Sequence, residues 1–270
     1  MGVPLLHVDA FTAVPFAGNA AAVCVLAAAA DERWMQRVAS ELNLGATAFV
    51  TPDATAGFRL RWFSPTVELA LCGHGTLATA HVLWERKAAA KEATLEFQTK
   101  SGPLRARRRG AWIELDFPLE PEAPAEPPPD LVRALGVTPK YVGRNRLDYL
   151  VEVDDEATLR RTRPDFARLR VVPTRGVIVT SAAADPDYDF VSRFFAPAVG
   201  IDEDAVTGSA HCCLAGFWRA RLGRDGLRGY QASARGGVVQ TEVDGDRVRL
   251  GGQAVTVLRG ELATPPASAV

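Results

Sequence analysis

The chain carries one pattern twice, and this repeat constrains its fold more than any other feature of the sequence. The first copy, FSPTVELALCGHGTLATAHVLW, begins at Phe63, and the second, FAPAVGIDEDAVTGSAHCCLAGFW, begins at Phe195. Both copies open on Phe-x-Pro, pass an acidic residue, reach a glycine turn and enter an alanine-rich amphipathic run that ends in tryptophan. A strand, a glycine turn and a helix that recur in this way predict two similar domains facing each other.

The two glycine turns, residues 72–75 and residues 207–210, are the places where we expect chemistry. They are called the first and the second glycine turn below. Each exposes backbone N–H groups at the N-terminus of a helix, and such groups suit a carboxylate or a developing oxyanion. The repeat therefore predicts a small-molecule site in the cleft between the two domains.

Chain length and a proline-rich segment suggest where the domains divide. A chain of 270 residues is long enough for two domains that each bury a core. Residues 119–130, LEPEAPAEPPPD, contain five prolines, which fix the backbone and remove donors, so we expect an extended linker there. This places a first domain at 1–118 and a second at 131–253. The sequence leaves open whether a last strand, about 254–265, crosses back to the first domain.

Hydrophobic periodicity predicts the same order of elements in both halves. In the first half we expect a helix over 31–42 with Asp31 as its N-cap, and a longer helix from about Gly75 to Lys87. Strands are expected at 3–10, 21–27, 47–51, 57–63, 93–98 and 112–117. The second half repeats a short helix, strands, the glycine turn and a long helix.

Charge and hydropathy exclude several classes of protein. Lys and Arg number 31 and Asp and Glu 32, so the net charge favours neither nucleic acid nor an anionic membrane as a partner. The basic run 105–109 has the alternation of a solvated strand face. No apolar stretch is long enough to span a bilayer, and the N-terminus lacks the basic region of a signal peptide. The cysteines form no disulfide-like framework and favour a reduced, cytoplasmic context: Cys24, Cys72, Cys212 and Cys213.

Two titratable residues accompany the glycine turns. His74 stands between two glycines at the head of a helix, where it can contact a substrate and change protonation near neutral pH, or act only as a surface or capping residue. Asp204 ends the stretch Ile-Asp-Glu-Asp, 201–204, which we expect to be a turn. It can act as a general base, orient a donor, or simply cap the following helix.

The glycine turns also supply candidate substrate-binding groups. Residues 207–210 have the composition of an anion cradle, although a tight turn alone would also need glycine. Cys72 aligns with Thr207, so the sequence does not favour a racemase with one thiol in each turn, while a role for Cys72 alone and a buried small side chain both stay open. The candidate substrate-binding residues are Asn19, Cys72, Gly73, Gly75, Thr207, Gly208 and Ser209.

Two familiar motifs are matched only superficially. Residues 73–78 fit the pattern G-x-G-x-x-G/A, but they do not open an N-terminal βαβ unit, so a dinucleotide site is rejected. The histidines and cysteines near the glycine turns lack the spacing of a structural zinc site. We therefore expect no metal.

Five segments in family order resemble the phenazine-biosynthesis PhzF-like family, which shares the diaminopimelate epimerase fold. They are DAFTAVPFAGNAAAV (9–23), NLGATAFV (43–50), RWFSPTVELALCGHGTLA (61–78), SRFFAPAVGIDEDAVTGSAH (192–211) and QASARGGVV (231–239). The resemblance implies an α+β fold of two pseudo-symmetric β-roll domains, each wrapping a central helix, with the active site between them. It also implies a homodimer and no metal or organic cofactor.

The same resemblance implies a chemistry, namely proton transfer on small carboxylic acids by isomerisation or epimerisation. Asp204 and His74 match the family's supporting aspartate and histidine, and Gly208 and Ser209 match its Gly-Ser pair. The family's catalytic glutamate is replaced here by Ala46, in the stretch NLGAT. A methyl group cannot exchange a proton, and general acid–base catalysis typically supplies about 10²–10⁴-fold in rate.

Two functions are consistent with this departure. The first is an isomerase in which Asp204 and His74 handle protons on a small carboxylate-bearing metabolite. The second is a ligand-binding or protein-interaction member of the family that has lost catalysis because of Ala46.

Overall fold

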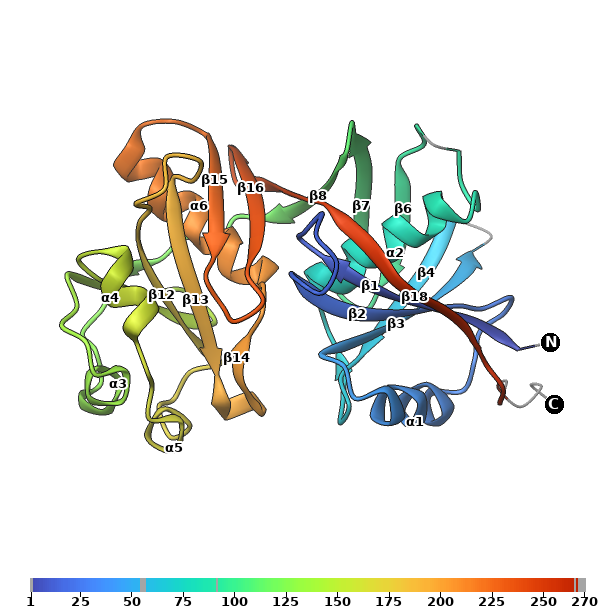
Figure 1. Cartoon of the computed structure of the whole chain (residues 1–270), viewed down its shortest axis with the longest axis horizontal. Helices are drawn as coiled ribbons and strands as arrows, with labels where there is room; N and C mark the ends of the chain where they lie inside the picture. Colours follow the sequence, from blue (N-terminus) through green and yellow to red (C-terminus); the bar gives the residue numbers. More distant parts are fainter. Residues whose placement is uncertain (1, 54–56, 91, 265, 267–270) are drawn as a thin grey trace. The chain divides into compact units, whose positions relative to one another are not determined.

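Curved, mostly antiparallel strands wrap around two long helices, which gives an α+β fold (Figure 1). The computed structural model describes residues 2–53, 57–90, 92–264 and 266. The chain divides into a first unit, Met1–Asp116 with Gly251–Val270, and a second unit, Phe117–Leu250. The strands of the first unit surround α2 (Gly73–Glu85) and those of the second surround α6 (Gly208–Leu222).

Strands of the first unit are connected by two parallel crossovers. Its other elements are β1 (Val3–Ala10), β2 (Asn19–Val25), α1 (Glu32–Leu42), β3 (Ala46–Asp53), β4 (Gly57–Phe63), β5 (Glu68–Leu69), β6 (Leu95–Thr99), β7 (Gly102–Arg109), β8 (Trp112–Pro118) and β18 (Ala254–Leu262). β1 pairs antiparallel with β2, and β2 runs parallel to β3, with α1 between them in the chain. β3 pairs antiparallel with β4, and β4 runs parallel to β6 after a crossover through β5 and α2.

Strands of the second unit pair in the same order. Its other elements are β9 (Ala123–Pro124), α3 (Pro129–Leu135), β10 (Tyr141–Arg144), β11 (Asp148–Glu152), α4 (Glu156–Arg161), α5 (Phe166–Leu169), β12 (Gly176–Ala182), β13 (Phe190–Ala196), η1 (Pro197–Val199), β14 (Ile201–Asp204), β15 (Gly226–Gln231), β16 (Gly237–Asp244) and β17 (Arg247–Gly252). β10 and β11 are antiparallel, β11 and β12 parallel, and β12 and β13 antiparallel. β13 then runs parallel to β15, after a crossover through β14 and α6.

Strand register confirms the internal repeat and fixes which positions correspond. Thr47 of β3 lies opposite Phe63 of β4, and Val177 of β12 lies opposite Phe195 of β13. Because the two phenylalanines open the two copies of the repeat, Ala46 corresponds to Gly176. By the same register, Gly45 corresponds to Arg175.

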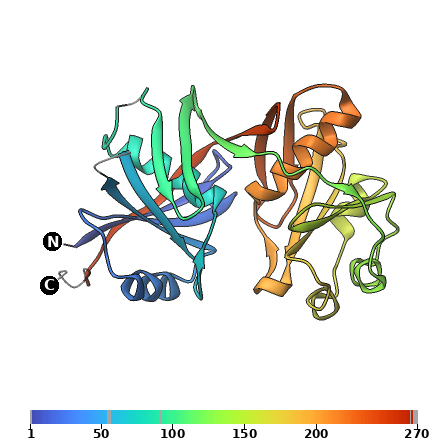
Figure 2. The ribbon, with the colours of Figure 1, turned by 180° about the vertical axis from the view of Figure 1, so that it is seen from behind.

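The two central helices are buried on nearly every side. Residues 75–80 of α2 and 210–215 of α6 are buried without a break, so these helices lack the polar face that the sequence pattern predicted. α2 begins at Gly73 rather than near Gly75. By contrast, α1 lies outside the strands against β3 and β4 (Figure 2), and Asp31 caps it as predicted by accepting a hydrogen bond from Trp34 N at 3.1 Å.

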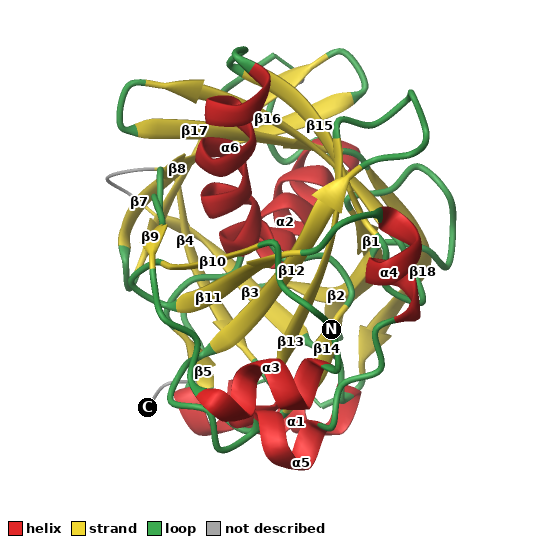
Figure 3. Ribbon diagram, turned by 90° about the vertical axis from the view of Figure 1, so that its left-hand side faces the viewer, coloured by secondary structure: helices red, strands yellow, loops and turns green. Residues whose placement is uncertain are grey.

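The chain ends and the proline-rich segment are fastened by backbone hydrogen bonds. β18 pairs antiparallel with β1 along most of its length. Within residues 119–130, β9 pairs with β10, and Leu119 N donates to Asp246 O at 2.9 Å. In the second unit, α3 and α5 lie together at the end away from α6 (Figure 3). Among the described ranges, no helix is both long and apolar enough to cross a bilayer.

Candidate active site

The first glycine turn brings a thiol and an imidazole together. Cys72 is the N-cap residue of α2, in extended conformation, and its side chain makes no capping hydrogen bond. Its Sγ lies 3.6 Å from His74 Nδ1 and 3.8 Å from His74 Nε2. Cys72 is buried, with 5% exposure, whereas His74 is half-buried. Thr76 Oγ1 donates to Cys72 O at 2.7 Å, which ties the first turn of α2 to its N-cap.

Close packing explains why glycine occupies position 75. A Cβ there would lie 2.8 Å from Trp62 Cδ1 and 3.0 Å from Cys72 Sγ. Trp62 is itself buried, and its Nε1 has no hydrogen-bond partner among the described residues. Gly75 therefore lets the start of α2 lie directly against β4.

Ala46, the residue predicted to replace the family's glutamate, lies at a buried strand start. Ala46 is the first residue of β3, has 0% exposure and pairs with Ala21 of β2. The preceding Gly45 has open space where a side chain would begin, because no atom lies within 4 Å of its ideal Cβ. The following Thr47 is also buried, and its Oγ1 has no hydrogen-bond partner within the described part of the chain.

Asn19 begins β2, directly after the loop formed by residues 11–18. It is buried, with 5% exposure, and lies opposite Ala10 of β1. Asp9 Oδ2 accepts a hydrogen bond from Phe16 N at 2.7 Å across this loop. Gly18 has φ +64° and a Cβ there would lie 2.3 Å from Ala10 O, so only glycine fits.

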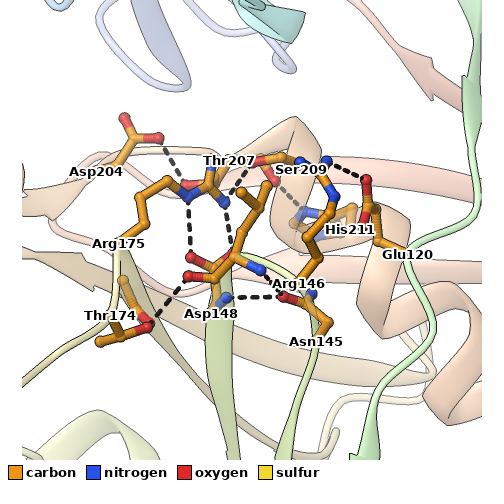
Figure 4. A network of polar contacts seen from close by, with 12 residues as sticks. Glu120, Asn145, Arg146, Asp148, Thr174, Arg175, Asp204, Thr207, Ser209 and His211 are labelled. Carbon is orange, nitrogen blue, oxygen red and sulfur yellow. Dashed lines mark hydrogen bonds and ion pairs between the residues drawn. The ribbon is translucent and has the colours of Figure 1, made fainter.

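In the second unit, Asp204 is held beside the second glycine turn (Figure 4). Residues 201–204 form β14 rather than the predicted turn, paired with β13. Asp204 Oδ2 accepts a hydrogen bond from Thr207 Oγ1 at 2.6 Å. The N-cap of α6 is Thr207, so the prediction that Asp204 could be a simple N-cap is wrong.

A buried glutamine locks this turn from an adjacent strand. Gln231, at the end of β15, has 0% exposure. Its Nε2 donates to Asp204 O at 2.7 Å, and its Oε1 accepts from Thr207 N at 2.8 Å. Both hydrogen bonds bridge β15 to the loop between β14 and α6, and so fix the direction in which α6 begins.

Ser209 receives a hydrogen bond from an arginine that is paired with a buried aspartate. Arg175 Nη2 lies 3.0 Å from Ser209 Oγ. Arg175 also donates through Nε and Nη2 to Asp148, at 2.9 and 2.5 Å. Asp148 begins β11 and has 1% exposure. Figure 4 shows this chain of contacts running from Asp148 through Arg175 to the start of α6.

The start of α6 presents unused backbone donors. The first N–H groups of a helix have no partner inside the helix, and the Thr207 side chain makes no capping hydrogen bond. The N–H groups of Gly208, Ser209 and Ala210 belong to this first turn, so they have no acceptor within the helix. The positive end of the helix dipole lies at the same point, so this turn can bind an anion.

Four further titratable side chains in or near the two turns or in the core are buried. His211 has 0% exposure, and burial lowers its pKa to about 4. Its Nδ1 donates to Thr207 O at 2.8 Å, and its Nε2 has no partner in the described structure. Burial raises the pKa of Cys24 and Cys213 to about 12 and also raises the pKa of Cys212. These thiols are therefore protonated near neutral pH.

The structure gathers the candidate residues into two groups, one in each unit. The first unit holds Asn19, Ala46, Cys72, Gly73, His74 and Gly75, and the second holds Asp204, Thr207, Gly208 and Ser209. Sequence patterns did not indicate Gln231, Arg175 or Asp148. Gln231 opens one of the segments, 231–239, that carry the family resemblance, whereas the other two belong to no motif. In the described ranges, no three His, Cys, Asp or Glu side chains are grouped as metal ligands.

Comparison with known proteins identifies the family. The family model for the phenazine biosynthesis-like protein, PhzC–PhzF, matches residues 8–260. An uncharacterized isomerase of Halalkalibacterium halodurans is 53% identical over 263 residues, which cover 97% of this chain and 99% of the relative. A crystal structure of a PhzF family protein from Enterococcus faecalis matches with a TM-score of 0.93 and 40% identity, over 98% of this chain and 100% of that one. A hydroxyproline epimerase of Agrobacterium vitis, 14% identical, shares the fold with a TM-score of 0.60 over 96% of this chain and 92% of that one. The chain therefore belongs to the phenazine biosynthesis-like PhzC–PhzF family.

Proposed function

We propose that the protein is a cofactor-independent isomerase that moves a proton on a small carboxylic acid held by its two glycine turns. The observation that carries this proposal is the uncapped start of α6, with Asp204 hydrogen-bonded to its N-cap residue. The fold of isomerases and epimerases and the isomerase named among its relatives support the same reaction class.

Different residues bind the carboxylate and transfer the proton. N–H groups of the second glycine turn and Ser209 Oγ bind the carboxylate, because the helix dipole and hydrogen-bond donors both favour a negative charge there. Asp204, oriented by the Thr207 hydroxyl, takes the proton from carbon. His74, in the first glycine turn, returns a proton to the new position. Both groups act as general acid and base without a metal or cofactor.

Deuterium exchange tests the proposal directly. Candidate acids that bind the protein are incubated with it in D₂O, and deuterium incorporation into the acid is followed by NMR. We expect exchange with at least one acid, and an Asp204→Asn variant should exchange about 10²–10⁴-fold more slowly. Asp202→Asn is the matched control, because Asp202 is exposed and pairs with Arg170, whose Nη2 lies 3.6 Å from Asp202 Oδ1. Exchange that is insensitive to Asp204, or absent for every acid that binds, contradicts the proposal.

Ala46 supports a second candidate function, a ligand-binding or protein-interaction member of the family without catalysis. A buried methyl group stands where the family's general acid/base belongs. An Ala46→Glu variant separates the two functions, with Ala48→Glu as a control at a second buried position of β3. Exchange that appears only in Ala46→Glu supports the non-catalytic function. Exchange that is present in the unmodified protein, and reduced by the change, supports the isomerase.

Assembly is part of the same proposal. The PhzF resemblance implies a homodimer, and light scattering coupled to gel filtration measures it. A mass equal to one chain at micromolar concentration would contradict the homodimer but not the isomerase, because one chain contains both glycine turns.

A further inference from the structure

Arg175 occupies a place in the second unit that is empty in the first. It precedes β12 and corresponds by register to Gly45, which precedes β3. The first unit has open space at Gly45 and a buried methyl group at Ala46. The second unit instead has a guanidinium that reaches the start of its central helix and contacts Ser209. Since Thr207 corresponds to Cys72, Ser209 corresponds to His74.

The guanidinium is fixed in place by a buried carboxylate. Asp148 accepts two hydrogen bonds from Arg175 and has 1% exposure, so the pair is a bidentate contact with little freedom. Asp148 is itself held, because its backbone N–H donates to Asn145 Oδ1 at 2.7 Å. The Arg175 guanidinium also lies 5.5 Å from the centre of the Phe194 ring. These contacts restrict its orientation relative to α6.

The direction of the hydrogen bond to Ser209 determines what that hydroxyl can do. A guanidinium has donors and no acceptor, so Arg175 donates and Ser209 Oγ accepts. The hydroxyl hydrogen of Ser209 is then directed away from Arg175 and is left to donate to another group. The hydrogen bond that Arg175 donates is charge-assisted, so it polarises the Ser209 hydroxyl. Ser209 Oγ–H then becomes a stronger donor to a third group.

Electrostatics at this point also favour an anion. A cation beside a helix N-terminus is normally unfavourable, because the helix dipole already places positive charge there. Here the guanidinium lies against the first turn of α6, where three backbone N–H groups have no acceptor within the helix. Asp148 compensates the arginine on the side buried in the unit. An acidic ligand group at the turn would compensate the remaining positive potential.

We propose that Arg175 is a positioning residue that makes the second glycine turn selective for a carboxylate, by holding Ser209 as a hydrogen-bond donor toward it. The inference rests on the proposed function, since it names how that site recognises its acid. Arg175 acts through Ser209 and is assigned no step of proton transfer.

Binding of acetate, with acetamide as a neutral molecule of the same shape, tests this role. Amide resonances of Gly208, Ser209 and Ala210 are followed by ¹H–¹⁵N NMR in the full chain. Replacing Arg175 alone leaves Asp148 buried without its partner and can unfold the unit, so the main variant is the neutral pair Arg175→Gln with Asp148→Asn. We expect its Kd for acetate to rise at least about tenfold, with acetamide binding unchanged. Arg146→Gln is the matched control, because Arg146 is exposed and pairs with Glu120.

A double-mutant cycle shows whether the effect passes through Ser209. In a Ser209→Ala background, the Arg175 and Asp148 changes should alter the acetate Kd less than about twofold. A folded double variant that binds acetate as the unmodified protein does would overturn the inference, and so would an undiminished effect in the Ser209→Ala background. Both results leave deuterium exchange, and therefore the proposed function, intact. If acetate does not perturb these amides in the unmodified protein, the carboxylate site and this inference both fail.

Discussion

The two glycine turns lie at the same place in two rolls of the same topology, yet they are stabilised differently. The first is held by packing, with Trp62 against Gly75 and the Cys72 thiol beside His74. The second is held by hydrogen bonds from Gln231 and, through Ser209, by Arg175. The difference indicates that hydrogen bonds organise the second turn, whereas close packing organises the first. The effect of a change in one turn can therefore be compared with the effect of the corresponding change in the other.

The largest expected effect comes from breaking the ion pair between Arg175 and Asp148, because the position of Arg175 is occupied by Gly45 in the first unit. Arg175→Gln leaves Asp148 buried and charged, and loss of one partner of a buried pair typically costs about 3–5 kcal/mol. The counterpart change, Gly45→Ala, meets no atom within 4 Å and should alter the free energy of unfolding by less than about 0.5 kcal/mol. Chemical denaturation monitored by tryptophan fluorescence measures both. Adding Asp148→Asn should restore most of the lost stability, and failure to do so would show that the pair is not the cause.

Acid sensitivity should differ between the starts of the two central helices. His211 and its counterpart Thr76 both donate to the carbonyl of their N-cap residue, at 2.8 and 2.7 Å, but only the histidine titrates. Burial lowers the pKa of folded His211 to about 4 from an ordinary value near 6.5, so the unfolded chain binds more protons between these values. Stability from this group is therefore full above pH 6.5 and falls as the pH drops toward 4, by about 3 kcal/mol in all.

Hydrogen exchange of the central helices between pH 7 and 4.5 measures this asymmetry. We expect amides in the first turn of α6 to lose protection relative to those in the first turn of α2 as the pH falls. A His211→Thr variant, which copies the first unit, should be less stable at pH 7 because it leaves a cavity, and its stability should depend less on pH. An unchanged pH dependence in that variant would assign the acid sensitivity to other groups.

A methyl group tests how closely the first glycine turn is packed. Gly75→Ala would place a Cβ 2.8 Å from Trp62 Cδ1, while the counterpart position in α6 already carries a methyl group, in Ala210. Overpacking of this kind typically costs about 1–3 kcal/mol. Gly216→Ala is the control inside α6, because its new Cβ would lie 3.6 Å from the nearest atom, and it should stabilise the helix by about 0.5–1 kcal/mol. The melting temperatures of both variants show whether close packing against Trp62 excludes any side chain larger than that of glycine at position 75.

Local sequence patterns predicted the fold well because the repeat recurs within short segments. The Phe-x-Pro openings, the glycine turns and the Asp31 cap each depend on neighbours in the chain, and each lies where it was expected. The polar face expected for α2 and α6 was wrong, because strands surround both helices. The pattern gave no signal for this enclosure, since alanine-rich helices suit either a surface or a crowded interior.

The residues that support the second glycine turn could not be predicted from the sequence, because their partners are distant in the chain. Arg175 lies 27 residues from Asp148 and 34 from Ser209, and only the crossover between β11 and β12 brings them together. Residues 201–204 were wrongly predicted to form a turn, also because a contact with another part of the chain determines their conformation. Its acidic residues are typical of a turn, but pairing with β13 makes it a strand, and Glu203 is bound there by Arg193 at 2.8 Å.

The smallest expected effect comes from exchanging the N-cap residues of the two turns. Cys72→Thr gives the first turn the residue of the second and keeps a small polar side chain beside His74. If Asp204 and His74 move the protons, the rate of deuterium exchange should stay within about threefold of that of the unmodified protein, because Cys72 then only packs against the imidazole. If the Cys72 thiolate is the base instead, the rate should fall by about 10²–10⁴-fold, and bound acid should protect the unmodified protein from alkylation at Cys72. The other three cysteines serve as an internal control for that alkylation, since burial keeps each of them protonated. A large loss of rate in Cys72→Thr would make the first turn, and not the second, the source of the base.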